Sequence, residues 1–284
     1  MIIQNADRAY EVLRHLGGTE QTEEYLCADQ ALGREDTFLL VRIADPVLAK
    51  RFMLFLDERV KGSGFTDYRE SFLEKGDFYA VFSCSVQPSL EEKLAMERCE
   101  RSERAKIAQG ILERLLLLSP HPYLAWNGLR KDQITVSPAL EVAFRYHFLN
   151  IEQPEAVTMT DVCGSLEEIF RLLFERELKK RLYPSLDEYV RRLQKGEEGS
   201  YLKLYRDFAA VAAELMKEEQ EEKPRTFWFR LWEKIKKILK FLRRVLMAAI
   251  LVAAVIYMVN ILRDDSGSRV EQKTMQQIGD LYIE

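Results

Sequence analysis

Histidine and cysteine, which often serve as metal ligands and nucleophiles, are scarce and scattered in this chain of 284 residues. The histidines are His15, His121 and His147, and the cysteines are Cys27, Cys84, Cys99 and Cys163. None of them stand at the spacing of a metal site, and no histidine can be identified as a base for Cys163. We therefore predict no metal site and no cofactor, and we interpret the cysteines as buried thiols in a reducing compartment.

Charge is strongly segregated along the chain, although the net charge of −4 is small. Residues 225–244 hold eight basic residues and one acidic residue, whereas the 224 residues before them carry −9. The last 22 residues carry −2. The acidic body argues against nucleic-acid binding, because a nucleic-acid site needs a basic surface.

Residues 245–262 form an apolar run of eighteen residues without a charge. A helix of this length covers about 27 Å, close to the thickness of the hydrocarbon core of a bilayer. We predict one transmembrane helix here; the alternative is a buried core helix. Basic residues cluster just before the run, and only Arg263 lies just after it. The positive-inside rule therefore places residues 1–244 in the cytoplasm and residues 263–284 outside.

Residues 225–244 also have an amphipathic pattern, which favours a helix lying in the headgroup region of the bilayer. The residues expected at this membrane interface are Trp228, Trp232, Lys236, Lys237, Lys240, Arg243 and Arg244. The alternative is that this segment extends the membrane helix into the cytosol. The preceding residues, 217–224, are a charged linker that ends in Pro224, and we place the domain boundary there.

The body, residues 1–216, is predicted to be mixed α+β, with strands mainly before residue 90 and helices after it. Strands are predicted at 38–43 and 78–83, with an earlier strand ending at 26–28 and a β pair at 134–136 and 141–144. Helices are predicted at 46–59, after an N-cap at Ser89, and at 102–119, 165–180, 184–193 and 200–217.

The order of these elements resembles the protein kinase fold, in which a β-rich lobe with one helix is joined by an extended hinge to a helical lobe. Residues 10–18 resemble the first strand and glycine-rich loop of bacterial serine/threonine kinases. Residues 78–94 resemble the hinge and the next helix, and residues 105–136 resemble the long helix and catalytic loop. Residues 161–174 resemble a helix of the large lobe. The resemblance implies a two-lobed kinase-like domain over residues 1–216; the alternative is another α+β domain.

Phosphoryl transfer in that family needs a glycine-rich loop over the phosphates, a lysine that binds them, a base and metal ligands. The loop matches only at Gly17 and Gly18. Three acidic residues follow, Glu20, Glu23 and Glu24, and we expect them to repel phosphates. The resemblance puts Arg42 at the lysine position and Leu54 at the position of the glutamate that binds the lysine.

The catalytic-loop motif H-R-D-L-K-P-E-N aligns with residues 126–133. Gly128 then replaces the base, and Gln133 replaces the metal-binding asparagine. No aspartate occurs between Gln133 and Thr160 to supply the second metal carboxylate. Loss of all these groups would remove phosphotransfer. The resemblance therefore implies a pseudokinase with a vestigial cleft around Gly17, Gly18, Arg42 and Asp132.

We expect a membrane-anchored pseudokinase that acts as a scaffold or sensor for a cytoplasmic protein partner. One alternative is a divergent kinase that binds ATP and uses a displaced carboxylate such as Asp132. Another is a subunit similar to the membrane pseudokinase of Gram-positive type VII secretion systems, although that subunit carries a large outer domain. A third is a receptor that forms homodimers through the span, because Ala249 and Ala253 make a small-x-x-x-small pair.

Overall fold

The computed structural model describes residues 1–5, 7–19, 21–31, 36–221 and 256. The chain divides into two units, residues 1–222 and 223–284, and the first unit is a mixed α+β body, as predicted. The predicted interfacial segment 225–244, the span 245–262 and the tail 263–284 lie outside the described residues, apart from Ile256, which is helical. No helix in the described ranges is long and apolar enough to cross a bilayer.

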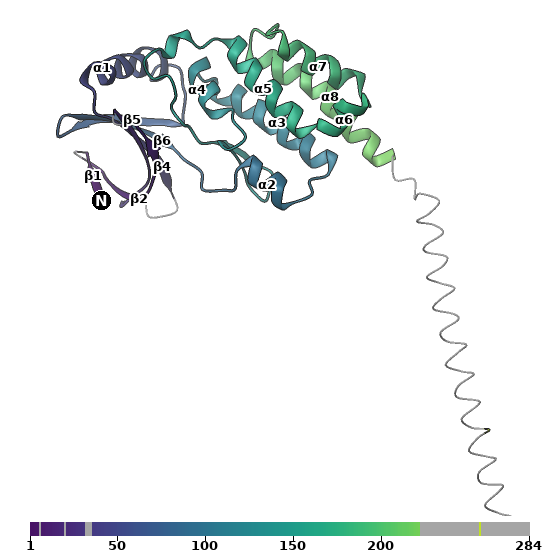
Figure 1. Cartoon of the computed structure of the whole chain (residues 1–284), viewed down its shortest axis with the longest axis horizontal. Coiled ribbons are helices and arrows are strands. Elements are labelled where there is room, and N and C mark those ends of the chain that lie inside the picture. Colours follow the sequence, from purple (N-terminus) through teal and green to yellow (C-terminus); the bar gives the residue numbers. More distant parts are fainter. Residues whose placement is uncertain (6, 20, 32–35, 222–255, 257–284) are drawn as a thin grey trace, which may run out of the picture. The chain divides into compact units, whose positions relative to one another are not determined.

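A six-stranded antiparallel sheet forms the N-terminal part of the first unit (Figure 1). Its strands are β1 (Ile2–Gln4), β2 (Ala9–Gly18), β3 (Thr22–Asp29), β4 (Thr37–Ile43), β5 (Tyr68–Glu74) and β6 (Asp77–Ser83), in the order β1-β2-β3-β4-β6-β5. The predicted strands at 38–43, 78–83 and 26–28 are confirmed. The sheet is curled so strongly that the Tyr10 hydroxyl on β2 donates a hydrogen bond to Glu70 Oε1 on β5, over 2.6 Å.

The curled sheet has an apolar outer face and an apolar inner face, because side chains alternate along each strand. Leu39, Val41 and Ile43 of β4 point outward and share a core with α1 (Pro46–Phe55). Phe38 and Leu40 point inward and fill the inside of the curl with aromatic side chains from β2, β3 and β6. The face on which a β4 residue lies therefore decides whether it can meet the helices.

Helix α1 begins where the sequence predicts it. The Asp45 carboxylate accepts hydrogen bonds from the backbone N–H groups of Val47 and Leu48, at 2.9 and 2.8 Å, and Pro46 suits the first turn. The predicted helix 46–59 is α-helical only as far as Phe55. A π-helical segment, η1 (Leu56–Val60), follows it directly.

Helices dominate the remainder of the first unit (Figure 1). They are α2 (Leu90–Met96), α3 (Arg101–Leu118), α4 (Pro122–Gly128), η2 (Pro154–Ala156), α5 (Met159–Leu173), α6 (Glu175–Lys180), α7 (Pro184–Gln194) and α8 (Tyr201–Glu221), and a β pair, β7 (Ile134–Val136) and β8 (Val142–Phe144), lies among them. The β pair, the Ser89 cap and helices α3 and α7 are confirmed. Helix α4 was not predicted, and α8 continues into the predicted linker 217–224.

The predicted helix 165–180 is wrong at its start and in its middle. A reciprocal capping pair, Thr158 with Asp161, starts α5 six residues earlier. The chain then breaks at Phe174, which separates α5 from α6. Phe174 is fully buried, with its ring 6.1 Å from the ring of Phe170 and 6.4 Å from that of Phe208. Tertiary packing of this ring therefore overrides local helix propensity.

One continuous core joins the sheet to the helices, so the first unit is a single packed body. The Phe148 ring, from the segment after β8, lies 4.8 Å from Phe82 of β6. A buried polar contact reinforces this packing. The Asp67 carboxylate, just before β5, accepts from Arg114 of α3 at 2.6 Å and from the Tyr146 hydroxyl at 2.8 Å.

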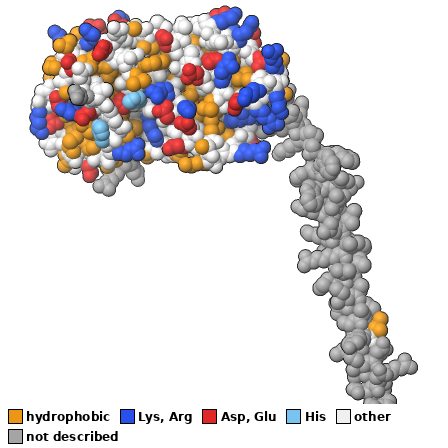
Figure 2. Space-filling model, in the orientation of Figure 1, with side chains coloured by type: hydrophobic (Ala, Val, Ile, Leu, Met, Phe, Trp, Pro, Cys, Tyr) orange, Lys and Arg blue, Asp and Glu red, His pale blue; other side chains and the backbone are white. Residues whose placement is uncertain are grey.

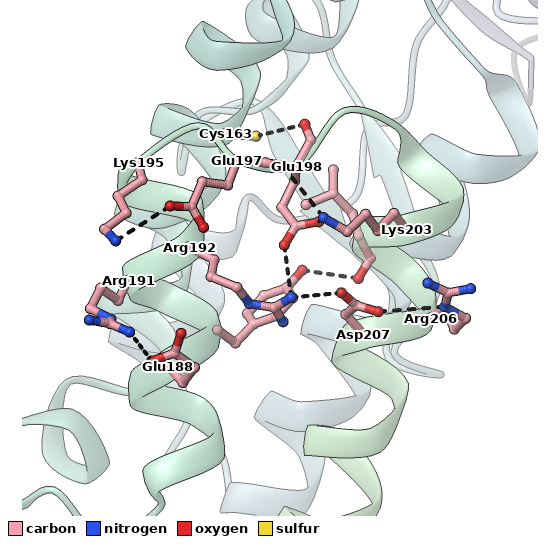
Figure 3. A network of polar contacts seen from close by, with 12 residues as sticks. Cys163, Glu188, Arg191, Arg192, Lys195, Glu197, Glu198, Lys203, Arg206 and Asp207 are labelled. Carbon is pink, nitrogen blue, oxygen red and sulfur yellow. Dashed lines mark hydrogen bonds and ion pairs between the residues drawn. The ribbon is translucent and has the colours of Figure 1, made fainter.

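A second buried charge fixes the loop between α7 and α8 (Figure 3). The Glu198 side chain is fully buried, with its carboxylate 3.2 Å from Arg192 Nη1 of α7 and 3.1 Å from Lys203 Nζ of α8. Arg192 also donates to Asp207 at 2.8 Å. Because a buried carboxylate is costly without a cation, this network holds the two helices at a fixed separation.

Replacement of Glu198 by alanine should lower the free energy of unfolding by about 2 kcal/mol, less than for a fully enclosed pair because both cations reach solvent. Urea unfolding measures the change. Glu197→Ala, which removes an exposed carboxylate 3.4 Å from Lys195, is the matched control and should cost less than about 0.5 kcal/mol. Equal losses in the two variants would contradict the role of the buried carboxylate.

Candidate functional site

Two cavities open where the sheet meets the helices. The larger, of about 690 Å³, lies under the β2–β3 turn, and its lining includes Thr22, Leu48 and Trp126. The smaller, of about 400 Å³, lies beside the extended segment 84–88, and its lining includes Leu26. Because Thr22 and Leu26 share one face of β3, residue 24 lies between the two cavities on that face.

Glu24 is that dividing residue. Its side chain is buried, and its two oxygens bind the segment that follows β8. Oε1 accepts the backbone N–H of Phe148 at 2.7 Å, and Oε2 lies 2.7 Å from Nδ1 of His147. Alternate residues of a strand are about 6.7 Å apart, so a ligand that occupied both cavities would have to displace this carboxylate.

Arg145 closes one edge of the smaller cavity. Its Nε donates to the backbone carbonyl of Ser85 at 2.7 Å, and its Nη2 donates to the carbonyl of Gln87. Each of these carbonyls therefore already accepts one hydrogen bond. Cys84 lines the same cavity, and burial raises the pKa of its thiol to about 11, which keeps it neutral and unreactive.

Arg42 lines neither of the two cavities. Because side chains alternate along β4, Arg42 lies on the same inner face of the curl as Leu40. There it binds Glu23 and donates to Asp77 at 2.7 Å. Hydrogen bonds from Tyr25 and Arg42 lower the pKa of Glu23. The outward β4 position that faces α1 next to Arg42 is Val41. The predicted lysine position is thus one residue out of register with the helix side of the sheet.

Two of the three acidic residues after the glycines also differ from their expected placement, and the third, Glu20, lies outside the described residues. Glu23 is neutralised by Arg42, and Glu24 is buried against His147, so neither projects from an open loop. Gly17 and Gly18 end β2. A side chain on Gly18 would overlap the backbone carbonyl of Thr22, so glycine is required there by the tight turn.

The catalytic-loop positions carry structural contacts. Gly128 ends α4, and a Cβ there would lie 3.2 Å from Phe144 Cβ and 3.3 Å from the Tyr146 ring. Gln133 donates to its neighbour Asp132 at 2.8 Å, and Asp132 is also 3.5 Å from Arg130 Nε.

None of the described residues that line the two cavities is Gly17, Gly18, Arg42 or Asp132.

Three residues of the site were not predicted: Glu24, Arg145 and His147. Glu24 was read as a loop acid, although it lies in a strand run whose neighbours Tyr25 and Leu26 are apolar. A charge in such a run signals a buried, partnered group.

Within the described ranges, no cluster of three or more histidine, cysteine or acidic residues could hold a metal ion. The seven residues predicted for the membrane interface, from Trp228 to Arg244, lie outside the described residues. Compared with known proteins, the chain matches no protein-family model, and no curated protein matches it.

Gly128→Ala should destabilise the protein by about 1–3 kcal/mol, because the added methyl group would lie only 3.2–3.3 Å from the side chains of Phe144 and Tyr146. Thermal or urea unfolding measures this. Gly164→Ala is the control: it lies inside α5 with open space around it, so alanine should stabilise by up to about 1 kcal/mol. If both substitutions stabilise the protein, the packing at Gly128 is looser than described.

The contact of His147 with Glu24 predicts a pH dependence of stability. Hydrogen bonding to the Glu24 carboxylate raises the pKa of His147; burial and Arg130 oppose this increase, and Asp132 adds to it. This contribution to stability is complete below the unfolded-state pKa of about 6.5 and is lost as pH rises through the higher folded-state pKa. The stability difference between wild type and His147→Gln should therefore be larger at pH 5.5 than at pH 8.5 in urea unfolding.

His121 supplies a control of opposite sign. Burial lowers the pKa of His121, so its neutral form is favoured in the folded state and stability is lost as pH falls. The stability difference between wild type and His121→Gln should shrink at pH 5.5. The same pH trend in both variants would contradict the assignment of the His147–Glu24 contact.

Proposed function

We propose that this chain is a membrane-anchored pseudokinase that serves as a scaffold or sensor for a cytoplasmic protein partner and performs no phosphotransfer. The observation that carries the proposal is the buried carboxylate of Glu24, which is bound to His147 and Phe148 between the two cavities. The order of a sheet with one helix, α1, an extended segment at 84–88 and then a helical part supports the kinase-like fold.

The charges of the larger cavity support the absence of nucleotide chemistry. Its lining includes the carboxylates of Glu152 and Asp161, and none of its described lining residues is lysine, arginine or histidine. Hydrogen bonds from Thr158 lower the pKa of Asp161, so this group is ionised at neutral pH. A triphosphate here would meet negative charge without a compensating cation.

The smaller cavity supports the same conclusion by a different route. A nucleotide base bound beside segment 84–88 would form hydrogen bonds with the backbone groups of that segment. Arg145 already donates hydrogen bonds to the carbonyls of Ser85 and Gln87. Gly128, at the expected base position, has no room for a carboxylate side chain. Position 41, which faces α1, is an apolar valine.

The anchoring part of the proposal rests on sequence. The uncharged run 245–262 is long enough to span a bilayer, and the basic segment 225–244 before it suits an anionic inner leaflet. A body held at a membrane without catalytic groups can act through binding, by positioning a partner protein beside the bilayer.

A thermal-shift titration of the full-length chain, recovered from washed membranes, tests the proposal. With ATP and magnesium the melting temperature should move by less than about 1 °C, because a ligand that does not bind the native state cannot stabilise it. A saturable rise of several degrees would contradict the proposal and favour a divergent kinase, and Asp132→Asn would then show whether that carboxylate is used. Recovery of the chain in the soluble fraction would contradict the anchor.

A further inference from the structure

A groove runs along one side of α1, between this helix and segment 149–157. The larger cavity reaches Leu48, and an adjoining cavity of about 560 Å³ is lined by Arg51, Leu54, Phe55 and Glu58. Both cavities share Glu152, Gln153 and Ala156, so they are continuous around η2. Residues 48 to 58 span about 15 Å of helix, the length of roughly three turns.

Apolar side chains line this groove. Leu54 is 46% exposed, although it lies on a helix whose neighbour Phe55 is buried in the core. Leu149 is 36% exposed on the opposite wall, and Trp126 lies partly open in the larger cavity. A contiguous set of exposed apolar side chains beside a cavity is typical of a surface that binds a partner.

Acidic side chains rim the groove. Its lining holds Glu58, Glu152, Glu155 and Asp161, against Arg51 as the one cation among the described lining residues. Arg51 donates to the backbone carbonyl of Glu152 at 3.0 Å, and not to its carboxylate.

One of these acids is partly neutralised. Glu155 lies 3.4 Å from Arg59, and both groups are exposed. Across the described residues, neither Glu58 nor Glu152 forms an ion pair. The groove therefore favours a cationic occupant over a phosphate, a nucleotide or an anionic lipid.

We propose that this groove is the docking site for a cationic amphipathic segment of the partner protein. Its apolar side chains would pack on the exposed Leu54. A lysine or arginine would enter the larger cavity between Glu152 and Asp161, against the Trp126 ring, where cation–π attraction adds to ion pairing. The inference rests on the proposed scaffold function, and it names the chemistry of the partner and the surface that receives it.

Fluorescence anisotropy tests this with the full-length chain in phosphatidylcholine nanodiscs. The probe is a labelled 14-residue helical peptide of leucine and lysine, and the comparison peptide has glutamate in place of lysine. The leucine–lysine peptide should bind saturably, and the glutamate peptide should not. Leu54→Asp should weaken binding at least tenfold, and so should the double variant Glu58→Lys with Glu152→Lys.

The matched controls change the same chemistry at surfaces away from the groove. Leu73→Asp alters an exposed leucine on β5, and Glu113→Lys with Glu141→Lys reverses two carboxylates beside α3 and β8. Both controls should bind the peptide within twofold of wild type. Equal loss in the control double variant would mean general attraction to an acidic body and would overturn the proposal, as would unchanged binding by the groove variants.

Three further outcomes separate this inference from its alternatives. If Leu54→Asp converts a dimer into a monomer in sedimentation, a second copy occupies the groove and the partner assignment is wrong. If the groove binds the peptide as expected while ATP stabilises the chain, the docking surface stands and the pseudokinase proposal fails. If neither ligand binds, only the docking surface is lost.

Discussion

The buried carboxylate of Glu24 is the constraint on which the junction between sheet and helices depends. It lies on β3, yet its hydrogen bonds run to His147 and to the Phe148 backbone, 123 and 124 residues further along the chain. A buried charge that loses its partners costs several kcal/mol, so the segment after β8 cannot leave this position cheaply. Asp67 makes an equivalent connection to α3 through Arg114, and the aromatic core between these two contacts is continuous. The sheet and the helices therefore behave as one packed body.

Other residues near this junction also hold the structure together. Arg145 binds the extended segment 84–88, Gly128 makes room for Phe144, and Val41 packs against α1. Charged side chains of both signs are interspersed over the face seen in Figure 2. A rigid body of this kind can present a fixed surface to a partner, and the acidic, apolar-lined groove beside α1 is the surface that we assign to this role.

Local signals in the sequence predicted much of the fold. Asp45 and Ser89 cap helices where expected, because a cap depends only on the next three residues. The register of β4 could not be predicted. Both faces of its run from residue 38 to 41 are apolar, so alternation does not tell which side meets α1 or on which face Arg42 lies. The break at Phe174 and the partners of Glu24 depend on contacts between residues far apart in sequence, which periodicity does not encode. The sequence shows a glycine at position 128, but it does not show that Phe144 and Tyr146 leave no room there for a larger side chain.

Amide hydrogen exchange at the Phe148 and Leu149 N–H groups is the most direct test of the contact between Glu24 and the segment after β8. Phe148 donates to Glu24, and Leu149 donates to the buried Asn127 side chain at 2.9 Å. The account predicts strong protection of both groups in the full-length chain, with rates unchanged by ATP and magnesium. Rapid exchange at these positions, or protection that increases when the nucleotide is added, would contradict it.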